Sequence, residues 1–561
     1  MSLINFAITL FFLYFTNTEQ FSMGEVVNIS LSQFSNHVST HLFNNQESHI
    51  PYKKNATVNY RNNVFLSTSS SGGHTNYAPR ALIYDLREGL GSLNKYEYHE
   101  PPSNFDHIPS GQRVNLERIV PKNQYQINLD KGVNPSAQDD ILTTGNTKYW
   151  TDYNKLIYNS KSLNTLTNFK HQQDGYGIHQ NFRNLKFNTF NVGQQEFSDN
   201  RDNIDTSLDT FRYFLEKCDL LQGLSLVTEM DSAWAGYSNS LLTELIDEYF
   251  STGISNSKHS IWMYGLYGTY NSGKPNLAQV VSRIKSTIEL TKNSTLFLPI
   301  NTRPSSLELF TNEYDDTSPW HSSSVSSMFI NSIWGINNQV DGSHSMSEIE
   351  DSLLRGNYQR KIVNEVKLNK IKPKAKEVSS IYNLSSDVDI SAYYSNPESL
   401  LKEKKQTMTK DDYVDLSFPT SIPNDKAFKP SKSTQYFVKD YIIPKDGSED
   451  LEESLNKRDQ GTPKNVYRNR DITDVMKGET FPKRILSDQE NFNFYTEFNV
   501  NTDFRAELSS FKTLLSNIKP SHVQLMEIIE DRAELVEDIS KLMEEYTIGT
   551  QFSDESDDDD Y

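Results

Sequence analysis

The 561-residue chain has one cysteine, Cys218, and therefore cannot form an internal disulfide. A chain without disulfides is typical of a reducing compartment. Cys218 lies at the edge of an apolar run with no histidine near it in the sequence, which favours a structural role for its side chain. The sequence thus excludes a disulfide-stabilised scaffold and gives no sign of thiol catalysis.

Common catalytic and metal-binding motifs are also missing from the sequence. There is no Walker-type phosphate loop, no Cys/His cluster with the spacing of a zinc site and no HExxH helix. Histidines and carboxylates are scattered, and no spacing assigns a pair of them to one site. These absences give no support to a hydrolase or a metalloenzyme.

Basic residues are outnumbered by acidic ones, with 55 Lys and Arg against 74 Asp and Glu, for a net charge of -19. A general nucleic-acid binder needs a basic face, so we expect no direct nucleic-acid binding. Spaced lysines over 367–376 are either a patch for an anionic membrane or nucleic acid, or a solvated linker.

No apolar run is long enough to cross a bilayer, which needs about 20 residues. Within residues 1–22 the run Leu3–Phe15 is too short, has no Lys or Arg before it and is followed by no evident cleavage site. We therefore expect no transmembrane span. We interpret Met23 as the functional start and residues 1–22 as an upstream extension, and a membrane-targeting signal is the alternative.

A strand, a loop and a helix are predicted over residues 218–249. Leu224 and Leu226 alternate with smaller side chains in a short run that is typical of a buried strand. Ser238 or Asn239 could cap the helix that follows. In open α/β sheets, this junction at the carboxyl end of a strand is where phosphates are usually held. The apolar residues at helical spacing are Leu241, Leu242, Leu245, Ile246 and Tyr249.

Alternation of strands and helices continues through the first half of the chain. Residues 261–267 and 295–300 predict strands, and 277–290 predict a helix between them, which supports an α/β core. Residues 192–196 predict a loop. The sequence thus predicts an α/β domain up to about residue 300.

The second half is less regular. Residues 345–366 predict a helix interrupted at Gly356, and 395–485 are polar with few apolar runs, which predicts loops or partial disorder. Apolar stripes over 504–518 and 525–542 predict two helices before an acidic tail. The predicted division is an extension at 1–22, an α/β domain at 23–300, an α+β domain at 301–390, a loop-rich region at 391–500, helices at 501–550 and the tail at 551–561.

Three segments resemble tubulin. CDLLQGLSLV, from Cys218, resembles the strand that precedes the tubulin loop GGGTGSG, which cradles the phosphates of GTP. Here the loop reads DSAWAGYS, and its one glycine is Gly236. A phosphate cradle needs glycines so that backbone N–H groups can turn inward. We expect Trp234 and Tyr237 to occupy that space, and Glu229 and Asp231 to repel an anion.

The other two segments retain part of the tubulin pattern. In EVVNISLSQFSNHVS, Gln33 and Asn36 fall on the family's nucleotide-contacting glutamine and asparagine, although both could simply satisfy loop backbone. In PRALIYDL, Asp85 matches the family's aspartate, while Arg87 replaces the magnesium-associated glutamate. Arg87 either lies at the surface or neutralises a phosphate. GNTKYW, residues 145–150, falls where tubulin has a second phosphate-side loop, GAGNNW.

Two further segments, DLREGLGSL from Asp85 and YWTDYNKLIYNSKSL from Tyr149, resemble the Misato family of tubulin-related proteins. This resemblance implies an α/β, tubulin/FtsZ-like fold: a Rossmann-like nucleotide-binding-type domain, an α+β domain and C-terminal helices. It also implies a role in partitioning mitochondria and in inheritance of mitochondrial DNA. Residence in mitochondria or cytoplasm would follow, with protein partners on the cytoskeleton or the mitochondrial outer surface.

Two main hypotheses remain for the mechanism. In the first, the chain is a non-enzymatic interaction protein without a cofactor, built on a degenerate nucleotide fold. In the second, it is a polymerising GTPase that holds GTP through Gln33, Asn36, Asp85 and Gly236. The tubulin motif that supplies an acidic residue to a neighbouring subunit's GTP is not found, which favours the first. A third hypothesis is a secreted or membrane-anchored protein directed by residues 1–22.

Overall fold

The fold is taken from a computed structural model. It describes residues 24–52, 57–71, 74–93, 120–133, 141–172, 175–182, 184–199, 201–250, 259–269, 276–304, 307–371, 413–419, 434–519 and 532–547. The predicted extension at 1–22 and the predicted tail at 551–561 lie outside the described residues.

A seven-stranded sheet forms the centre of the first half of the chain, in the order β6-β5-β4-β1-β7-β8-β9. Its neighbouring strands are parallel except for β5 and β6, which are antiparallel. Every residue of β1 and β8 is buried; β8 is almost continuously apolar in sequence, whereas β1 also buries the polar residues Glu25, Asn28 and Ser30. The strands are β1 (Glu25–Leu31), β4 (Ala81–Arg87), β5 (Leu163–Gln172), β6 (Gly175–His179), β7 (Leu221–Glu229), β8 (Ser260–Tyr267) and β9 (Leu296–Asn301).

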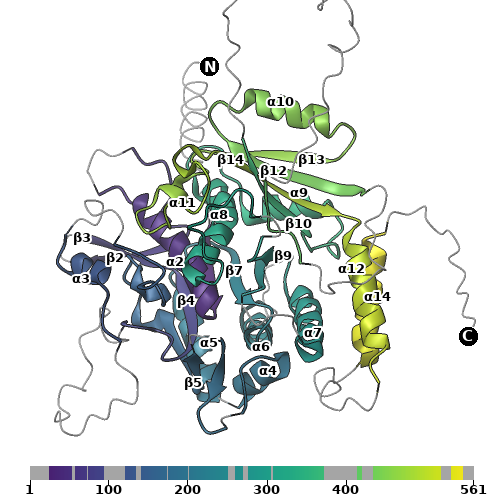
Figure 1. Ribbon diagram of the computed structural model, residues 1–561, viewed down its shortest axis with the longest axis horizontal. Helices are drawn as coiled ribbons and strands as arrows, with labels where there is room; N and C mark the ends of the chain where they lie inside the picture. Colours follow the sequence, from purple (N-terminus) through teal and green to yellow (C-terminus); the bar gives the residue numbers. More distant parts are fainter. Residues whose placement is uncertain are drawn as a thin grey trace, which may run out of the picture.

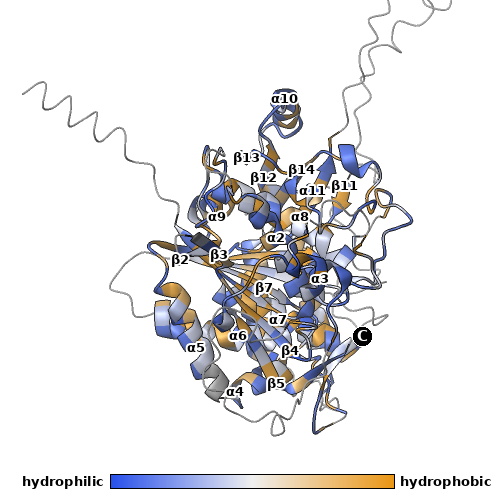
Figure 2. Cartoon of the chain, turned by 90° about the vertical axis from the view of Figure 1, so that its left-hand side faces the viewer, coloured by the Kyte–Doolittle hydropathy of each residue, from blue (hydrophilic) through white to orange (hydrophobic). Residues whose placement is uncertain are grey.

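Helices surround this sheet, and Figure 2 shows its apolar strands running between more polar helices. One group of helices packs near β1, β7 and β8, and a second group packs together beside β7, β8 and β9. The first group is α2 (Gln33–Ser48), α8 (Pro319–Asn338) and α9 (Met346–Leu354). The second is α4 (Phe190–Ser198), α5 (Arg201–Leu215), α6 (Trp234–Leu245) and α7 (Leu277–Asn293). A hairpin of β2 (Leu66–Ser71) and β3 (His74–Pro79) and the short helix α3 (Gln124–Asp130) lie outside the sheet.

The contact between α2 and α8 is polar although it is deeply buried. Every residue from Trp320 to Asn338 of α8 is buried. Five α8 serine hydroxyls donate to carbonyls three or four residues earlier in their own helix, as Ser324 does to His321 O at 2.7 Å, and Ser326 Oγ has no partner. Between the helices, Asn45 Nδ2 donates to Asn331 Oδ1 at 2.9 Å. Small side chains that mostly bond within their own helix therefore let the two helices pack in the interior.

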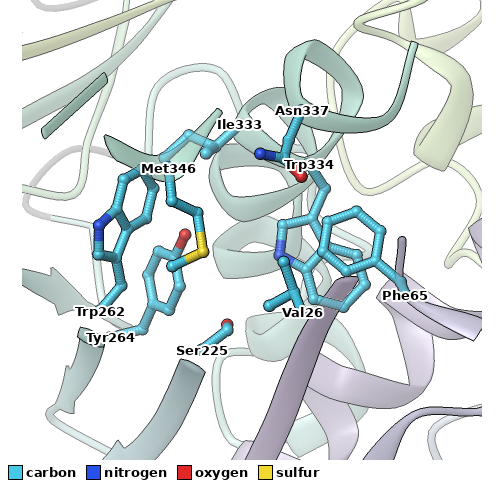
Figure 3. Close-up of a pocket in the computed structure, with 9 residues that line it drawn as sticks. All are labelled: Val26, Phe65, Ser225, Trp262, Tyr264, Ile333, Trp334, Asn337 and Met346. Atoms are coloured by element: carbon cyan, nitrogen blue, oxygen red, sulfur yellow. The ribbon is translucent and has the colours of Figure 1, made fainter. Parts of the chain in front are cut away.

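A small cavity remains where α8 and α9 cover the sheet (Figure 3). Its volume is about 10 Å³, roughly the space of one water molecule. Trp334 stacks on Phe65 at this point, with ring centroids 3.9 Å apart. The hydroxyl of Ser225, in the cavity wall, has no hydrogen-bond partner. The sheet is thus packed closely, but not completely, against α8 and α9.

A five-stranded sheet, in the order β11-β10-β14-β12-β13, covers the opposite side of α8 (Figure 1). Asn469 Nδ2 donates to Ser332 O at 2.9 Å, and Thr496 Oγ1 donates to Ser332 Oγ at 3.0 Å, so α8 is joined to this sheet by side chains. Its strands are β10 (Glu365–Lys370), β11 (Tyr413–Asp415), β12 (Tyr436–Pro444), β13 (Lys464–Asn469) and β14 (Phe494–Asn501).

This second sheet corrects two predictions. The region 391–500, predicted to be loops, supplies four of the five strands and the helices α10 (Glu449–Arg458) and α11 (Asp474–Lys477). Its polar residues misled the prediction because β14 alternates core residues such as Phe498 with buried polar ones such as Glu497 and Asn499. The helix predicted over 345–366 ends at Leu354, because Arg355 and Gly356 have positive φ, and the chain then enters β10.

The C-terminal helices lie along one side of the molecule (Figure 1). They are α12 (Phe504–Ser516) and α14 (Arg532–Glu545), and they pack against each other. Lys292 at the end of α7 pairs with Asp538 of α14, with 2.7 Å between Nζ and Oδ2. Among the described residues, no helix has both the length and the apolar character needed to cross a membrane.

Candidate functional site

A half-open cleft of about 890 Å³ lies at the carboxyl ends of the central strands, where ligands bind in open α/β sheets. The starts of three helices also reach it. The residues of its wall come from both ends of the first half of the chain and from the loops between strands and helices. They are Gln33 and Phe34 from α2, Thr144, Gly145, Thr147 and Lys148, His171 and Gln172 of β5, Gly175 and Tyr176 of β6, Lys186, Asn188, Glu229 of β7, Thr269, Asn276 and Gln279 at α7, Arg303, Asp315, and Thr317 to Pro319 at α8.

Three of the four predicted nucleotide-binding residues come together beside this cleft. Asn36 Nδ2 donates to Asp85 Oδ2 at 3.1 Å and to Tyr84 O at 3.0 Å. With its amide oriented to satisfy both ends, Gln33 Nε2 donates to Asp85 Oδ2 at 2.6 Å and to Gly89 O at 3.0 Å. Of the three, Gln33 lines the cleft, and Asn36 and Asp85 lie behind it in the core. The structure therefore groups these residues but directs their polar atoms at one another.

The carboxyl group of Asp85 is completely buried and surrounded by donors. Besides Gln33 and Asn36, Trp150 Nε1 donates to its Oδ2 at 3.0 Å, and Leu86 N donates to its Oδ1 at 2.8 Å. Burial raises the pKa of Asp85 to about 7, while these hydrogen bonds act in the opposite direction. No described group of three or more His, Cys, Asp or Glu side chains could hold a metal ion.

The start of α6 differs from the predicted loop. The helix begins at Trp234, not near the predicted caps Ser238 and Asn239, so the connection from β7 is shorter than DSAWAGYS. Trp234 and Tyr237 do not fill the cleft as expected, because both are buried in the core, where Trp234 packs edge-on against Phe187 with ring centroids 5.2 Å apart. Their aromatic surface is more stable when it packs against other rings than when it is exposed to water.

The first turn of α6 is satisfied by its own neighbours. Ser232 Oγ accepts from Trp234 N at 3.3 Å, and Ser232 O accepts from Ala235 N at 3.4 Å. The same Ser232 hydroxyl donates to Glu229 Oε2 at 3.0 Å. The Glu229 carboxylate is thus joined through Ser232 to an amide that would have to face a phosphate, and Glu229 also lines the cleft.

Gly236, the fourth predicted site residue, belongs to a helix contact. A Cβ at Gly236 would lie 1.9 Å from Phe190 O, and one at Gly193 of α4 would lie 1.7 Å from Ala233 O. Residues 192–196 were predicted to be a loop, but they form part of α4, which crosses α6 at these two glycines. Gly236 therefore allows close helix packing and does not line the cleft.

Two charged side chains near the cleft bond to other residues of the chain. Asp231 Oδ1 pairs with Arg283 Nε of α7 at 2.5 Å, and its Oδ2 accepts from Gly268 N at 2.6 Å. Arg87 does not line the cleft, and its Nη1 donates to Gln180 Oε1 at 2.9 Å. Of the two alternatives for Arg87, its position thus favours the surface one.

Sequence reasoning missed several cleft residues that come from separate segments. Lys186, Arg303 and Gln279 are polar residues in parts of the chain that carry no motif, and only the folded sheet brings them together. Lys148 had a signal, because GNTKYW was aligned with a phosphate-side loop, and both Lys148 and Gly145 of that segment line the cleft.

Comparisons with known proteins fit this architecture. A family model for the Misato Segment II tubulin-like domain matches residues 24–131, and one for the Tubulin domain matches residues 139–336. Protein DML1 of Scheffersomyces stipitis is 53% identical over 96% of this chain and 100% of the relative. The chain belongs to the Misato family of tubulin-like proteins. Proteins of the same name from Debaryomyces hansenii and Candida albicans are 42% and 36% identical, over 95% and 96% of this chain and 99% and 100% of the relatives.

Family membership confirms the predicted resemblance to the Misato family and the predicted α/β, tubulin-like fold class. In this Misato-family chain, the segments that resemble tubulin most closely form β1, the start of α2, β4 and β7. The start of α2 and the end of β7 line the cleft through Gln33, Phe34 and Glu229, at the edge of the sheet where open α/β sheets bind ligands.

We expect alanine at Gly236 or Gly193 to lower the free energy of unfolding by about 1–3 kcal/mol, because the added methyl group would overlap a backbone carbonyl. Urea unfolding of the full chain measures this. Gly175→Ala is the matched control, because nothing lies within 4 Å of its Cβ position. An unchanged midpoint for Gly236→Ala, together with weaker nucleotide binding, would instead assign Gly236 to a phosphate site.

Asp85→Asn is expected to change how stability depends on pH. The carboxyl group has a pKa of about 7 when folded and 3.8 ordinarily, so between these values folding takes up a proton. The contribution of Asp85 to stability is therefore complete below pH 3.8 and is lost as pH rises to 7, by about 1.4 kcal/mol per pH unit. The difference in the free energy of unfolding between wild type and Asp85→Asn, measured by urea unfolding across this pH range, isolates the effect. A difference that is independent of pH would show that Asp85 stays ionised.

Proposed function

We propose that this Misato-family protein works as a non-hydrolysing organising protein that helps to partition mitochondria and to pass on mitochondrial DNA. It binds protein partners through its surfaces and resides at mitochondria, with a cytoplasmic fraction. The biological role is carried by family membership, and the absence of hydrolysis is a separate step that rests on the geometry beside the cleft.

The start of α6 is the observation that supports an absence of hydrolysis. In a tubulin-like site, this turn must present free amides to the phosphates, and glycines must let them approach. Here Ser232 already accepts hydrogen bonds from two of the amides, and Glu229 adds a negative charge. The backbone oxygen of Phe190 packs against Gly236. A triphosphate would have to displace these contacts and approach a carboxylate, which Coulomb repulsion opposes.

The position of Asp85 supports the same proposal. A magnesium ion beside a triphosphate needs carboxylate oxygens that face the ligand. Both oxygens of Asp85 already accept hydrogen bonds from the protein, and its raised pKa disfavours the ionised form that a metal requires. Arg87, at the position of the family's magnesium-associated glutamate, points to Gln180.

A second candidate function is a GTP-binding, polymerising GTPase. The observation that favours it is the cleft, which is open, lies at the carboxyl ends of the strands and has Gln33 in its wall. Its volume of about 890 Å³ is within the range of small-molecule sites. This candidate requires the first turn of α6 to rearrange when nucleotide binds.

Equilibrium titration of the purified chain with GTP and GDP separates the two candidates. We expect no saturable binding below millimolar concentration, no effect of Mg²⁺ and no phosphate release above the protein-free rate. Tubulin, assayed in parallel, is the positive control. Micromolar GTP affinity that depends on Mg²⁺, with turnover, would replace the first candidate by the second.

Depletion of the protein from the cell of origin tests the biological role. We expect mitochondria to be divided unequally between daughter cells and mitochondrial DNA to be lost over successive divisions. Microscopy of labelled mitochondria and quantification of mitochondrial DNA measure both effects. Complementation by the wild-type chain controls for indirect effects of the depletion. Normal inheritance of both in depleted cells would contradict the proposed role.

A further inference from the structure

The cleft has a local charge opposite in sign to that of the whole chain. Lys148 and Lys186 line it and are exposed, and neither forms a salt bridge with a residue that the structure describes, although Lys148 attracts the largely buried carboxyl group of Asp152. Arg303 is a third cation in its wall. The whole chain has a net charge of -19, so an accumulation of accessible cations is a local feature and not a consequence of composition.

The acidic and titratable groups of the cleft are less available than its lysines. Glu229 is buried and accepts from Ser232 Oγ at 3.0 Å. Asp315 Oδ1 accepts from Thr317 N at 2.9 Å and from Thr317 Oγ1 at 2.6 Å. Burial lowers the pKa of His171 to about 4, so its ring is neutral near pH 7. The wall therefore holds three cations against two carboxylates, of which Glu229 is buried and Asp315 is partly buried.

Three long helices begin at the cleft and add to this positive potential. Gln33 and Phe34 start α2, Asn276 caps α7, and Ser318 precedes α8. The amino end of each helix has the equivalent of roughly half a positive charge. The Ser318 side chain makes no capping hydrogen bond. Helix dipoles and lysines thus act together on the same space.

The arrangement suits separate carboxylates better than a compact polyanion. A polyphosphate needs a dense cradle of amides, and the cleft has none at the start of α6. Its cations come instead from separate segments, and the carboxamides of Gln172 and Asn188 lie in the same wall. A carboxamide can both donate to and accept from a peptide backbone. An extended chain with several acidic side chains matches both features.

We propose that this cleft binds an Asp- and Glu-rich peptide segment of a partner protein, held by Lys148, Lys186 and Arg303. The inference rests on the proposed function, because it requires that nucleotide does not occupy the cleft. It names the chemistry of the partner surface that the non-hydrolysing protein recognises.

The test is fluorescence anisotropy of the full chain with a short labelled peptide of alternating Glu and Ser. We expect saturable binding that weakens as salt is added, because screening reduces attraction between exposed charges. Lys148→Glu combined with Lys186→Glu is expected to raise Kd at least about tenfold, because two attractions become repulsions. The same variant is expected to gain affinity for a peptide of alternating Lys and Ser.

Lys512→Glu combined with Lys541→Glu is the matched control. Both lysines are exposed, lie on the C-terminal helices and change the net charge by the same amount. This pair is expected to alter Kd less than about twofold. Equal urea unfolding curves establish that all variants are folded. Absence of peptide binding by wild type, or equal loss in both pairs of variants, would overturn the inference.

A GTP titration of the peptide complex separates failure of this inference from failure of the proposed function. If GTP displaces the peptide and is hydrolysed, the proposed function fails and the cleft belongs to nucleotide. If neither GTP nor the acidic peptide binds, the peptide inference alone fails. Binding of the peptide without competition by GTP supports both.

Discussion

The structure depends on the buried contact between α2 and α8. These helices lie between the two sheets, and each brings polar side chains into an environment where an unpaired polar group would cost about 1–3 kcal/mol. Many of their groups avoid this cost by pairing with one another, as Asn338 Nδ2 does with Gln46 Oε1 at 2.7 Å, while the amide oxygens of Asn45 and Asn338 have no hydrogen-bond partner. The same pairing fixes the register of one helix against the other, since an apolar interface could slide more easily.

This contact also determines what the start of α2 can do. Gln33 and Asn36 lie in the first turn of a helix that is held along its length by α8, so their positions against β4 are set by the core. Their amides reach Asp85 and the backbone near it, not a ligand. His37, one residue later, hydrogen-bonds through Nδ1 to Tyr153 Oη at 2.8 Å, which continues the internal network away from the cleft.

The sequence predicts correctly those strands and helices whose apolar residues recur with the period of the element they form. The strand before residue 230, the strand at 261–267 and the helix at 277–290 appear as β7, β8 and α7. It failed where buried polar residues mimic a loop, as in β12 and β14, because hydrophobic periodicity cannot recognise a core built of paired polar groups. It also failed at α4, whose closeness to α6 depends on two glycines distant in sequence.

For the candidate site, sequence reasoning grouped three residues that do lie together in the structure, but it could not give their partners. Gln33, Asn36 and Asp85 do meet, as the resemblance to tubulin implied. That Trp150 would donate to Asp85, and that Trp234 would turn into the core, depends on side-chain directions that no motif specifies. The basic character of the cleft was hidden for the same reason, because its cations come from three separate segments.

Three carboxylates beside the cleft are satisfied by the protein itself in the structure without a ligand. A buried carboxylate without a partner costs several kcal/mol, so each such group needs a donor or must become neutral. Asp231 has Arg283, Glu229 has Ser232, and Asp85 has both several donors and a raised pKa. Satisfying three carboxylates beside one cleft with protein groups makes the ligand-free form stable by itself. Lys148 and Lys186 in the cleft wall are exposed and need no such compensation, so they are the groups that the proposed acidic peptide would contact.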